Sequence, residues 1–158
     1  MNMNTIDFRQ LLTVLKKGRP VILWLDDERD PMSEYPTRLG YDPGEYRPTY
    51  VEGVVGKCND SKVNRWDVIW VKDYEGFVEY IDNHGIPDVI CFDHDLGGQM
   101  TGKDCANYLV EKLMDMDEIG PIIRSQSSNP AGAANILNLL GNWREHYVRN
   151  HPEQFNKQ

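Results

Sequence analysis

The chain has 158 residues, of which 40% are hydrophobic and 27% are charged, and its formal net charge at pH 7 is −8. This length and composition are typical of a single globular domain, and they exclude a disordered or fibrous chain. The negative charge argues against a broad nucleic-acid surface, because such a surface needs a basic stripe. A small nucleotide, or an RNA end held by a few residues and a metal, is compatible with it.

The sequence also indicates whether the protein associates with a membrane and which compartment it occupies. No apolar stretch approaches the ~20 residues that cross a bilayer, so we expect no membrane association. The first five residues lack the basic start and apolar core of a signal peptide. Cys58, Cys91 and Cys105 are odd in number and lack CxxC spacing, which favours reduced thiols in a cytoplasmic protein. We interpret Cys91, which lies within a strand pattern, as a small core residue.

The first predicted elements are a helix and a strand. Thr5 is the predicted cap of the helix and Gly18 its end, and its apolar stripe is Phe8, Leu11, Leu12 and Leu15. A short apolar run at about residues 20 to 25 predicts the first strand.

Residues 31 to 66 form the least regular stretch, rich in proline and glycine. A connection this long in a compact domain is usually functional or contains short elements. We interpret it as an insertion into one domain that spans residues 1 to 158, and its role stays open. Within it, residues 46 to 51 together with Val54 and Val55 predict a small hairpin.

Strands and helices then alternate. A strand at 67 to 71 leads into a helix capped by Asp73 and stopped by Gly85, and a third strand covers 88 to 92. Thr101 begins the next helix with capping-box spacing, and Gly120-Pro121 ends it.

A short fourth strand follows at 121 to 123, and the last helix begins around residues 128 to 130. We expect residues 149 to 158 to be a frayed tail. Because strands alternating with helices imply right-handed crossovers, the predicted fold is a small doubly wound α/β domain. Its parallel sheet has about four strands flanked by helices, without an evident fifth strand.

Two of the hydrophobic runs end in acidic residues. Val-Ile-Leu-Trp-Leu leads into Asp26 and Asp27, and Val-Ile-Cys-Phe leads into Asp93 and, two residues later, Asp95. Open α/β sheets bind ligands beyond the carboxyl ends of their strands, so these carboxylates are expected in one crevice. A hard divalent cation relieves their repulsion, and Mg²⁺ in particular binds one or two carboxylates together with phosphate oxygens. Each acidic pair is also compatible with ordinary turn or cap chemistry.

A hydroxyl-rich segment precedes the last helix. Ser125, Ser127, Ser128 and Asn129 are candidate phosphate ligands, because a helix N-terminus presents free N–H groups and a partial positive charge. The alternative is that Ser128 or Asn129 merely caps the helix. Arg29 and Arg124 can each fork onto a phosphate or pair with a neighbouring acid.

His94 lies between two acids, and its pKa near 6.5 suits acid–base catalysis at neutral pH. Strand alternation can instead direct its side chain away from Asp93 and Asp95.

This order of motifs resembles the receiver domain of response regulators. The resemblance implies that Asp26 and Asp27 bind metal and that Asp93 stands at the phosphate-accepting position. It also places Asp95 where a backbone carbonyl ligand lies, and Ser125 where the phosphoryl-binding hydroxyl lies. Receivers also carry a lysine after a fifth strand. We find no such strand here, which counts against a phosphorylation switch.

The chain is more similar to cyclic-phosphate processing receiver domains. Three segments carry that resemblance, namely Leu-Asp-Asp-Glu-Arg-Asp-Pro from residue 25, Phe-Asp-His-Asp-Leu-Gly from residue 92 and Ser-Gln-Ser-Ser-Asn-Pro-Ala-Gly from residue 125. The resemblance spans about residues 20 to 140. It implies a receiver-like fold and the processing of cyclic or terminal phosphates of nucleotides or RNA.

The sequence therefore favours a metal-dependent phosphoesterase. Asp26, Asp27 and Asp93 are the expected ligands of a divalent metal, Mg²⁺ or alternatively Mn²⁺, and Asp93, His94 and Asp95 are the expected catalytic residues, while Arg29 joins the phosphate ligands. Asp93 is either a nucleophile or only a ligand while a metal-activated water attacks.

The competing function is a non-catalytic receiver-like module that binds a phosphorylated ligand or partner protein. A haloacid-dehalogenase-type phosphatase fits poorly, because its DxD motif lies on the first strand whereas Asp93 and Asp95 follow the third.

Overall fold

The computed structural model describes residues 3–16, 19–34, 48–55 and 66–155. Four parallel strands form one sheet in the order β2-β1-β3-β4, and their bounds are β1 Val21–Leu25, β2 Asp67–Val71, β3 Val89–Phe92 and β4 Ile122–Ser125. The predicted doubly wound parallel sheet of four strands is confirmed, and in the described part of the chain the sheet has no fifth strand.

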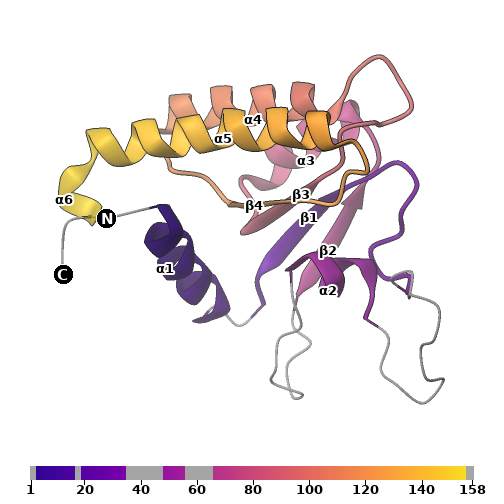
Figure 1. Cartoon of the computed structure of the whole chain (residues 1–158), viewed down its shortest axis with the longest axis horizontal. Coiled ribbons are helices and arrows are strands. Elements are labelled where there is room, and N and C mark those ends of the chain that lie inside the picture. The colour runs from indigo at the N-terminus through magenta and orange to yellow at the C-terminus, as the bar shows by residue number, and fades with distance from the viewer. Residues whose placement is uncertain (1–2, 17–18, 35–47, 56–65, 156–158) are drawn as a thin grey trace.

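Helices cover both faces of this sheet (Figure 1). One face is covered by α3 Tyr74–His84, α4 Gly102–Met116 and α5 Pro130–Asn150, and the other by α1 Met3–Lys16 and the short α2 Tyr50–Val55. The chain moves from β1 outward to β2, and then back across β1 to β3 and β4. Right-handed crossovers in opposite directions place their helices on opposite faces, which explains why α2 lies opposite α3 and α4.

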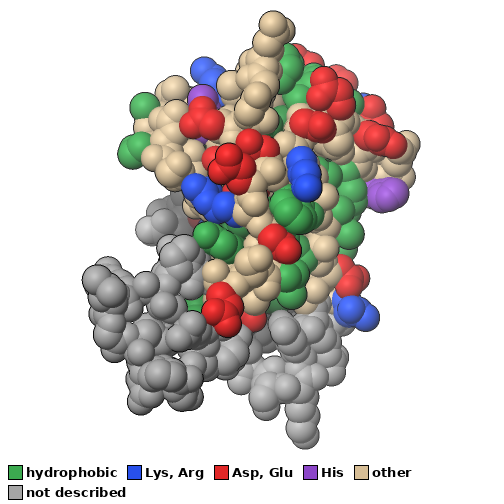
Figure 2. Space-filling model, turned by 90° about the vertical axis from the view of Figure 1, so that its right-hand side faces the viewer, with side chains coloured by type: hydrophobic (Ala, Val, Ile, Leu, Met, Phe, Trp, Pro, Cys, Tyr) green, Lys and Arg blue, Asp and Glu red, His purple; other side chains and the backbone are tan. Residues whose placement is uncertain are grey.

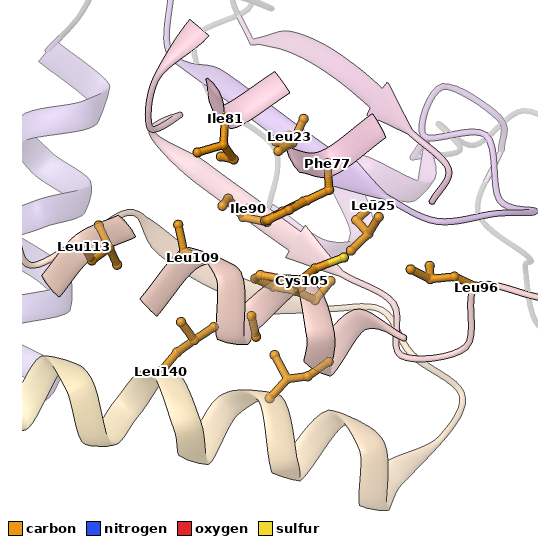
Figure 3. Close-up of a cluster of buried hydrophobic side chains, with 13 residues drawn as sticks. Leu23, Leu25, Phe77, Ile81, Ile90, Leu96, Cys105, Leu109, Leu113 and Leu140 are labelled. Carbon is orange, nitrogen blue, oxygen red and sulfur yellow. The ribbon is translucent and has the colours of Figure 1, made fainter. Parts of the chain in front are cut away.

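Strand alternation divides the core into two clusters. Leu23 and Leu25 face α3, α4 and α5, where they pack with Phe77, Phe92 and Leu109 (Figure 3). Their neighbours point to the opposite face, where the buried set is Val14, Ile22, Trp24, Val51, Val89, Cys91 and Ile122. Cys91 is fully buried, as expected of a core residue, whereas Cys58 lies outside the described residues.

Several predicted helix boundaries are confirmed by their capping contacts. The Asp73 carboxylate accepts a hydrogen bond from the backbone N–H of Gly76, and Gly85 ends α3 at φ 82°. The capping box of α4 is formed by Thr101 and Asp104. These ends satisfy backbone groups that helix termini otherwise leave unpaired.

The predicted end of α4 is wrong. The helix stops at Met116, four residues before Gly120, because Asp117 adopts a left-handed conformation with φ 53°. Aspartate tolerates this conformation better than most residues, since its short polar side chain bonds to nearby backbone.

The predicted hairpin is also wrong. Residues 46 and 47 lie outside the described residues, but Tyr50–Val55 is a helix whose start is capped by the Thr49 hydroxyl, which accepts from the backbone N–H of Glu52 at 3.3 Å. Among the described residues of this stretch, only an isolated bridge between Glu34 and Thr49 is β-like. The helix buries Val51 against the sheet, whereas an isolated hairpin is marginal in water.

Both ends of the chain also differ from expectation. Thr5 lies inside α1 and does not cap it, and Gly18 lies outside the described residues. The buried positions of α1 are Ile6 and Val14, two turns apart, while Phe8 and Leu12 are exposed. Only one stripe of a short helix can reach the sheet, and the position of α1 selects that stripe.

The frayed tail predicted from residue 149 is largely helical. Helix α5 continues to Asn150, and α6 covers Pro152–Phe155. Tyr147 holds this end in place, because its ring stacks on His151 at 4.0 Å and meets Phe155 edge-on at 6.2 Å.

A buried arginine joins α1 to α5, and we predict that this contact stabilises the fold. Arg144 is 6% exposed and donates to Asp7 at 2.6 Å and to the carbonyl of Pro121 at 3.3 Å. Asp7→Asn should lower the free energy of unfolding by about 1–2 kcal/mol, because it leaves a buried charge without its carboxylate.

Urea denaturation measures this effect, with Asp67→Asn as the matched control. Asp67 pairs with Arg19 on the surface, where a salt bridge contributes less than about 1 kcal/mol. Equal effects of the two substitutions would contradict the role of Arg144.

Candidate metal centre

The candidate site lies where the sheet reverses its strand order. β1 and β3 are neighbours, but the chain leaves β1 toward one edge of the sheet and leaves β3 toward the other. Ligands of open α/β sheets bind beyond the carboxyl ends of the strands at such a switch point. The register pairs Leu25 with Phe92, so the acids that follow them emerge side by side.

Three carboxylates meet at this point. One oxygen from each of Asp26, Asp27 and Asp93 lies within 4.8 Å of the others, and Asp26 and Asp93 are 1% and 6% exposed. Acidic side chains gather at this end of the molecule, with Lys or Arg side chains among them (Figure 2). Three hard oxygen donors so close together suit a divalent cation, and the triad could hold one.

Asp26 serves as a turn residue and as a member of this cluster. Its Oδ1 accepts from the backbone N–H groups of Glu28 and Arg29 at 3.0 and 2.8 Å. Its backbone carbonyl accepts from the Trp70 indole at 2.7 Å. The turn interpretation and the metal interpretation are therefore compatible, because the turn fixes one carboxylate oxygen and leaves Oδ2 directed at the side chain of Arg29.

The charged form of the buried Asp93 carboxylate is disfavoured by its surroundings. Burial is the largest cause that raises its pKa, to about 6, and the negative charges of Asp26 and Asp27 raise it further. Arg29 and the backbone N–H of His94 act in the opposite direction. The cluster therefore holds more negative charge than its surroundings neutralise, and a cation would supply the missing charge.

Arg29 connects the acids to the loop after β4. Its Nη1 lies 3.3 Å from Asp26 Oδ2 and donates to the carbonyl of Gln126 at 2.7 Å. The Trp24 indole donates to the Arg29 carbonyl at 2.9 Å, which fixes the backbone there. Arg29 thus pairs with a neighbouring acid, one of the two alternatives that the sequence left open.

His94 and Asp95 form a separate group beside the triad. His94 Nδ1 lies 3.0 Å from Asp95 Oδ1, and the Asn129 amide is 3.4 Å from both side chains. His94 therefore does not point away from Asp95, because the loop after β3 turns before strand alternation applies. The hydrogen bond from His94 lowers the pKa of Asp95, whose carboxylate is exposed and lies outside the triad.

Glycines allow this loop to pass close to the acids and to α5. A Cβ on Gly132 would lie 2.3 Å from the His94 ring, and a Cβ on Gly102 would lie 1.9 Å from the carbonyl oxygen of Asp93. Gly97 has φ 72°, and a Cβ there would lie 3.1 Å from Asp27 Oδ2. None of these positions accommodates a larger side chain without rearrangement.

The hydroxyl-rich segment organises its own backbone. Ser125 Oγ accepts from the N–H of Ser127, and Ser127 Oγ accepts from the N–H of Asn129. Asn129 caps α5 by accepting from the N–H of Gly132 at 3.0 Å, so the cap is Asn129 and not Ser128, whose side chain is exposed.

A pocket of about 570 Å³ opens between this loop and α2. Its lining includes Arg29, Tyr50, Arg124, Ser125, Gln126 and Ser127. Three of the five expected phosphate ligands, Arg29, Ser125 and Ser127, therefore share one pocket, while Ser128 and Asn129 lie outside its lining. Arg29 belongs to both the pocket and the acidic cluster, which makes the two continuous.

Sequence reasoning missed the role of Gln126 and Gly132. The Gln126 amide donates to the carbonyls of Leu25 and Cys91, so it joins the ends of β1, β3 and β4. Its place directly after a strand was the available signal. Gly132 gave only a weak signal, a glycine in the first turn of a helix, and its closeness to His94 depends on tertiary packing.

A parallel sheet in this order, with acids at its switch point, defines a receiver-like α/β domain. The profile of the cyclic-phosphate processing receiver domain matches residues 21–142, which is more than half of the chain. The chain therefore belongs to this family, and the resemblance read from its three motifs is confirmed.

Other comparisons add little. No curated protein matches the chain. One solved structure, described as a yeast Spc42 trimeric coiled coil fused to another structure, shares 15% identity over 89% of this chain and 85% of its own, with a TM-score of 0.44. A likeness this low carries no argument. No helix among the described residues is long and apolar enough to span a membrane.

We predict that Asp93→Asn stabilises the metal-free protein. Because folding raises the Asp93 pKa from 3.8 to about 6, the wild type loses stability as pH rises through this range. The variant does not titrate, so it should exceed the wild type by about 1–3 kcal/mol above pH 6 and by little near pH 4. Urea unfolding in EDTA at both pH values tests this, and a pH-independent difference would contradict it.

We predict that substitutions at two glycines of α5 have opposite effects on stability, and this comparison tests the position of His94. Gly132→Ala should cost about 1–3 kcal/mol, because the new methyl group overlaps the imidazole. Gly141→Ala is the control, since nothing lies within 4 Å of its Cβ, and it should stabilise the helix by about 0.5–1 kcal/mol. Thermal unfolding compares the two, and a harmless Gly132→Ala would place His94 elsewhere.

Proposed function

We propose that this protein is a metal-dependent phosphoesterase that acts on a cyclic or terminal phosphate of a nucleotide or an RNA end. The observation that supports it best is the continuity of the acidic triad with a pocket that contains arginine and serine side chains. Phosphoryl transfer depends mainly on positioning and on neutralising charge, and these two features supply both. Membership of a cyclic-phosphate processing family agrees with this chemistry.

Asp26, Asp27 and Asp93 would hold the cation. All three offer carboxylate oxygens, which favour Mg²⁺ or Mn²⁺ over softer metals. A bound divalent cation supplies positive charge to the phosphate oxygens. Arg29 already neutralises part of the cluster through its contact with Asp26 Oδ2, and this contact orients the Asp26 side chain.

The phosphate itself would be bound from the opposite side. Arg29 offers its remaining guanidinium donors, and Ser125 and Ser127 offer hydroxyl groups in the same pocket. Ser128 and Asn129 stand at the start of α5, whose N-terminal dipole favours an anion. Together these groups would fix the phosphorus beside the carboxylates.

Hydrolysis of a cyclic phosphate breaks one phosphorus–oxygen bond, and the released ribose oxygen takes up a proton. We assign that proton to His94, whose bond from Nδ1 to Asp95 leaves Nε2 to exchange it. The attacking group is either water, which gives up a proton as its oxygen bonds to phosphorus, or the Asp93 carboxylate, which would form an aspartyl-phosphate that is still esterified to the nucleotide and that water then hydrolyses. Trapping of labelled phosphate on the protein distinguishes these two routes.

One observation favours the second candidate, a module that binds a phosphorylated ligand or partner without turnover. Within the part of the chain that the structure describes, the sheet ends at β4, so the strand that carries the receiver lysine has no counterpart. Arg29 beside Asp26 also gives the cluster a built-in cation. Such a protein would bind phosphate without completing a reaction.

We predict that pure protein hydrolyses at least one member of a panel of 2′,3′-cyclic, 3′,5′-cyclic and linear nucleotides. Turnover should require Mg²⁺ or Mn²⁺ and be abolished by EDTA. Asp93→Asn should lower kcat about 100-fold or more, because it removes a charge from the metal site. Phosphate release is the measurement.

The matched control is Asp115→Asn, which removes an equal charge from an exposed position on α4. It should leave turnover unchanged. Full activity in Asp93→Asn would contradict the assignment of the site. No turnover by a protein that binds metal would favour the binding module.

A further inference from the structure

Arg124 on β4 is a cation that the triad does not use. Its Nη1 donates to the carbonyl of Ile123 at 2.9 Å, and no carboxylate among the described residues pairs with it. Arg29 and Arg144, by contrast, each contact an aspartate. Arg124 is partly buried. Removing a guanidinium group from water costs free energy when no anion pairs with it, so a bound anion would stabilise the protein here.

The charge of Arg124 affects the pKa values of two other side chains. Burial raises the pKa of the Cys91 thiol to about 12, and Arg124 is the group that opposes the rise. Burial is the largest cause that lowers the pKa of Arg144, and the charge of Arg124 lowers it further. Arg124 therefore lies close enough to affect titratable groups on β3 and α5.

The pocket around Arg124 lies beside the outer edge of the sheet. β4 is an edge strand, and a flavodoxin-like sheet would place its fifth strand next to it. Among the described residues, this space is bounded by α2 and by the loop after β4. The pocket therefore opens at the carboxyl end of an edge strand.

Two further groups in the lining suit an organic ligand. Gln126 lines the pocket, and its Oε1 atom, which is buried without a hydrogen-bond partner, would accept from a ligand N–H or O–H once the side chain turns outward. Tyr50 contributes an aromatic side chain on the α2 side. The volume of about 570 Å³ exceeds what one phosphate needs and is typical of small-molecule sites.

We propose that this β4-edge pocket binds a second phosphate of the substrate on Arg124, which makes the substrate a nucleotide or RNA end with two phosphate groups. The inference rests on the proposed function for the first phosphate, which lies at the triad. Arg29 stands between the two positions, because it contacts Asp26 and also lines the pocket. A mononucleotide with one phosphate would leave Arg124 unpaired.

Equilibrium binding tests this without any need for turnover. Isothermal titration with Mg²⁺ compares adenosine 3′,5′-bisphosphate with adenosine 3′-monophosphate and adenosine 5′-monophosphate. The full-length wild type should bind the bisphosphate at least ~10-fold tighter than either monophosphate, since an additional charged hydrogen-bonded pair contributes on that scale. Arg124→Gln should reduce this ratio to within about twofold.

Arg149→Gln is the control, because it removes the same charge from an exposed site at the far end of α5 and should keep the ratio. Circular dichroism checks folding, and Arg124→Lys replaces Arg124→Gln if the latter unfolds, with a partial loss of the ratio expected. A wild-type ratio near one, or a ratio that Arg124 variants leave unchanged, would overturn the proposal. An Arg124-dependent ratio in a protein without turnover would uphold the pocket and reject the phosphoesterase.

Discussion

Repulsion among three carboxylates dominates the carboxyl end of this sheet. Asp26, Asp27 and Asp93 lie within 4.8 Å of one another, and two of them are buried. Backbone N–H groups and Arg29 hold the cluster together, while burial, followed by the charge of Asp26, raises the pKa of Asp93. A raised pKa at a functional position is expected when a ligand supplies the missing positive charge.

The strand order of the sheet brings these charges together. Because β1 and β3 are adjacent and parallel, one change in strand order brings two acidic turns together. The strands that carry the acids are anchored by two separate apolar clusters, one on each face of the sheet. The loop after β4 completes the site, since Gln126 ties its end to both β1 and β3. Membership of the cyclic-phosphate processing receiver family is consistent with this construction.

The parts of the fold that were predictable from sequence depend on local chemistry. Buried strands appear as short apolar runs, and Asp73 and Gly85 bound α3 through contacts with their immediate neighbours. The grouping of Asp26, Asp27 and Asp93 was also predictable, because parallel strands must bring their carboxyl ends to one edge of the sheet.

Features set by tertiary packing were not predictable. The buried stripe of α1 depends on where that helix meets the sheet, and α2 forms a helix because Val51 can be buried there. The contact of His94 with Asp95 depends on a glycine at position 132 of another element. It could not be predicted either that Arg124 has no carboxylate partner among the described residues, because pairing with an acid depends on distance in space and not on sequence spacing.

The central claim is that the three aspartates form one divalent-cation site, and counting bound Mn²⁺ by electron paramagnetic resonance tests it most directly. We predict one ion per chain in the wild type, its loss in Asp93→Asn, and its retention in Asp95→Asn, because Asp95 lies outside the triad. Retention of the ion in Asp93→Asn, or its loss only in Asp95→Asn, would contradict the claim.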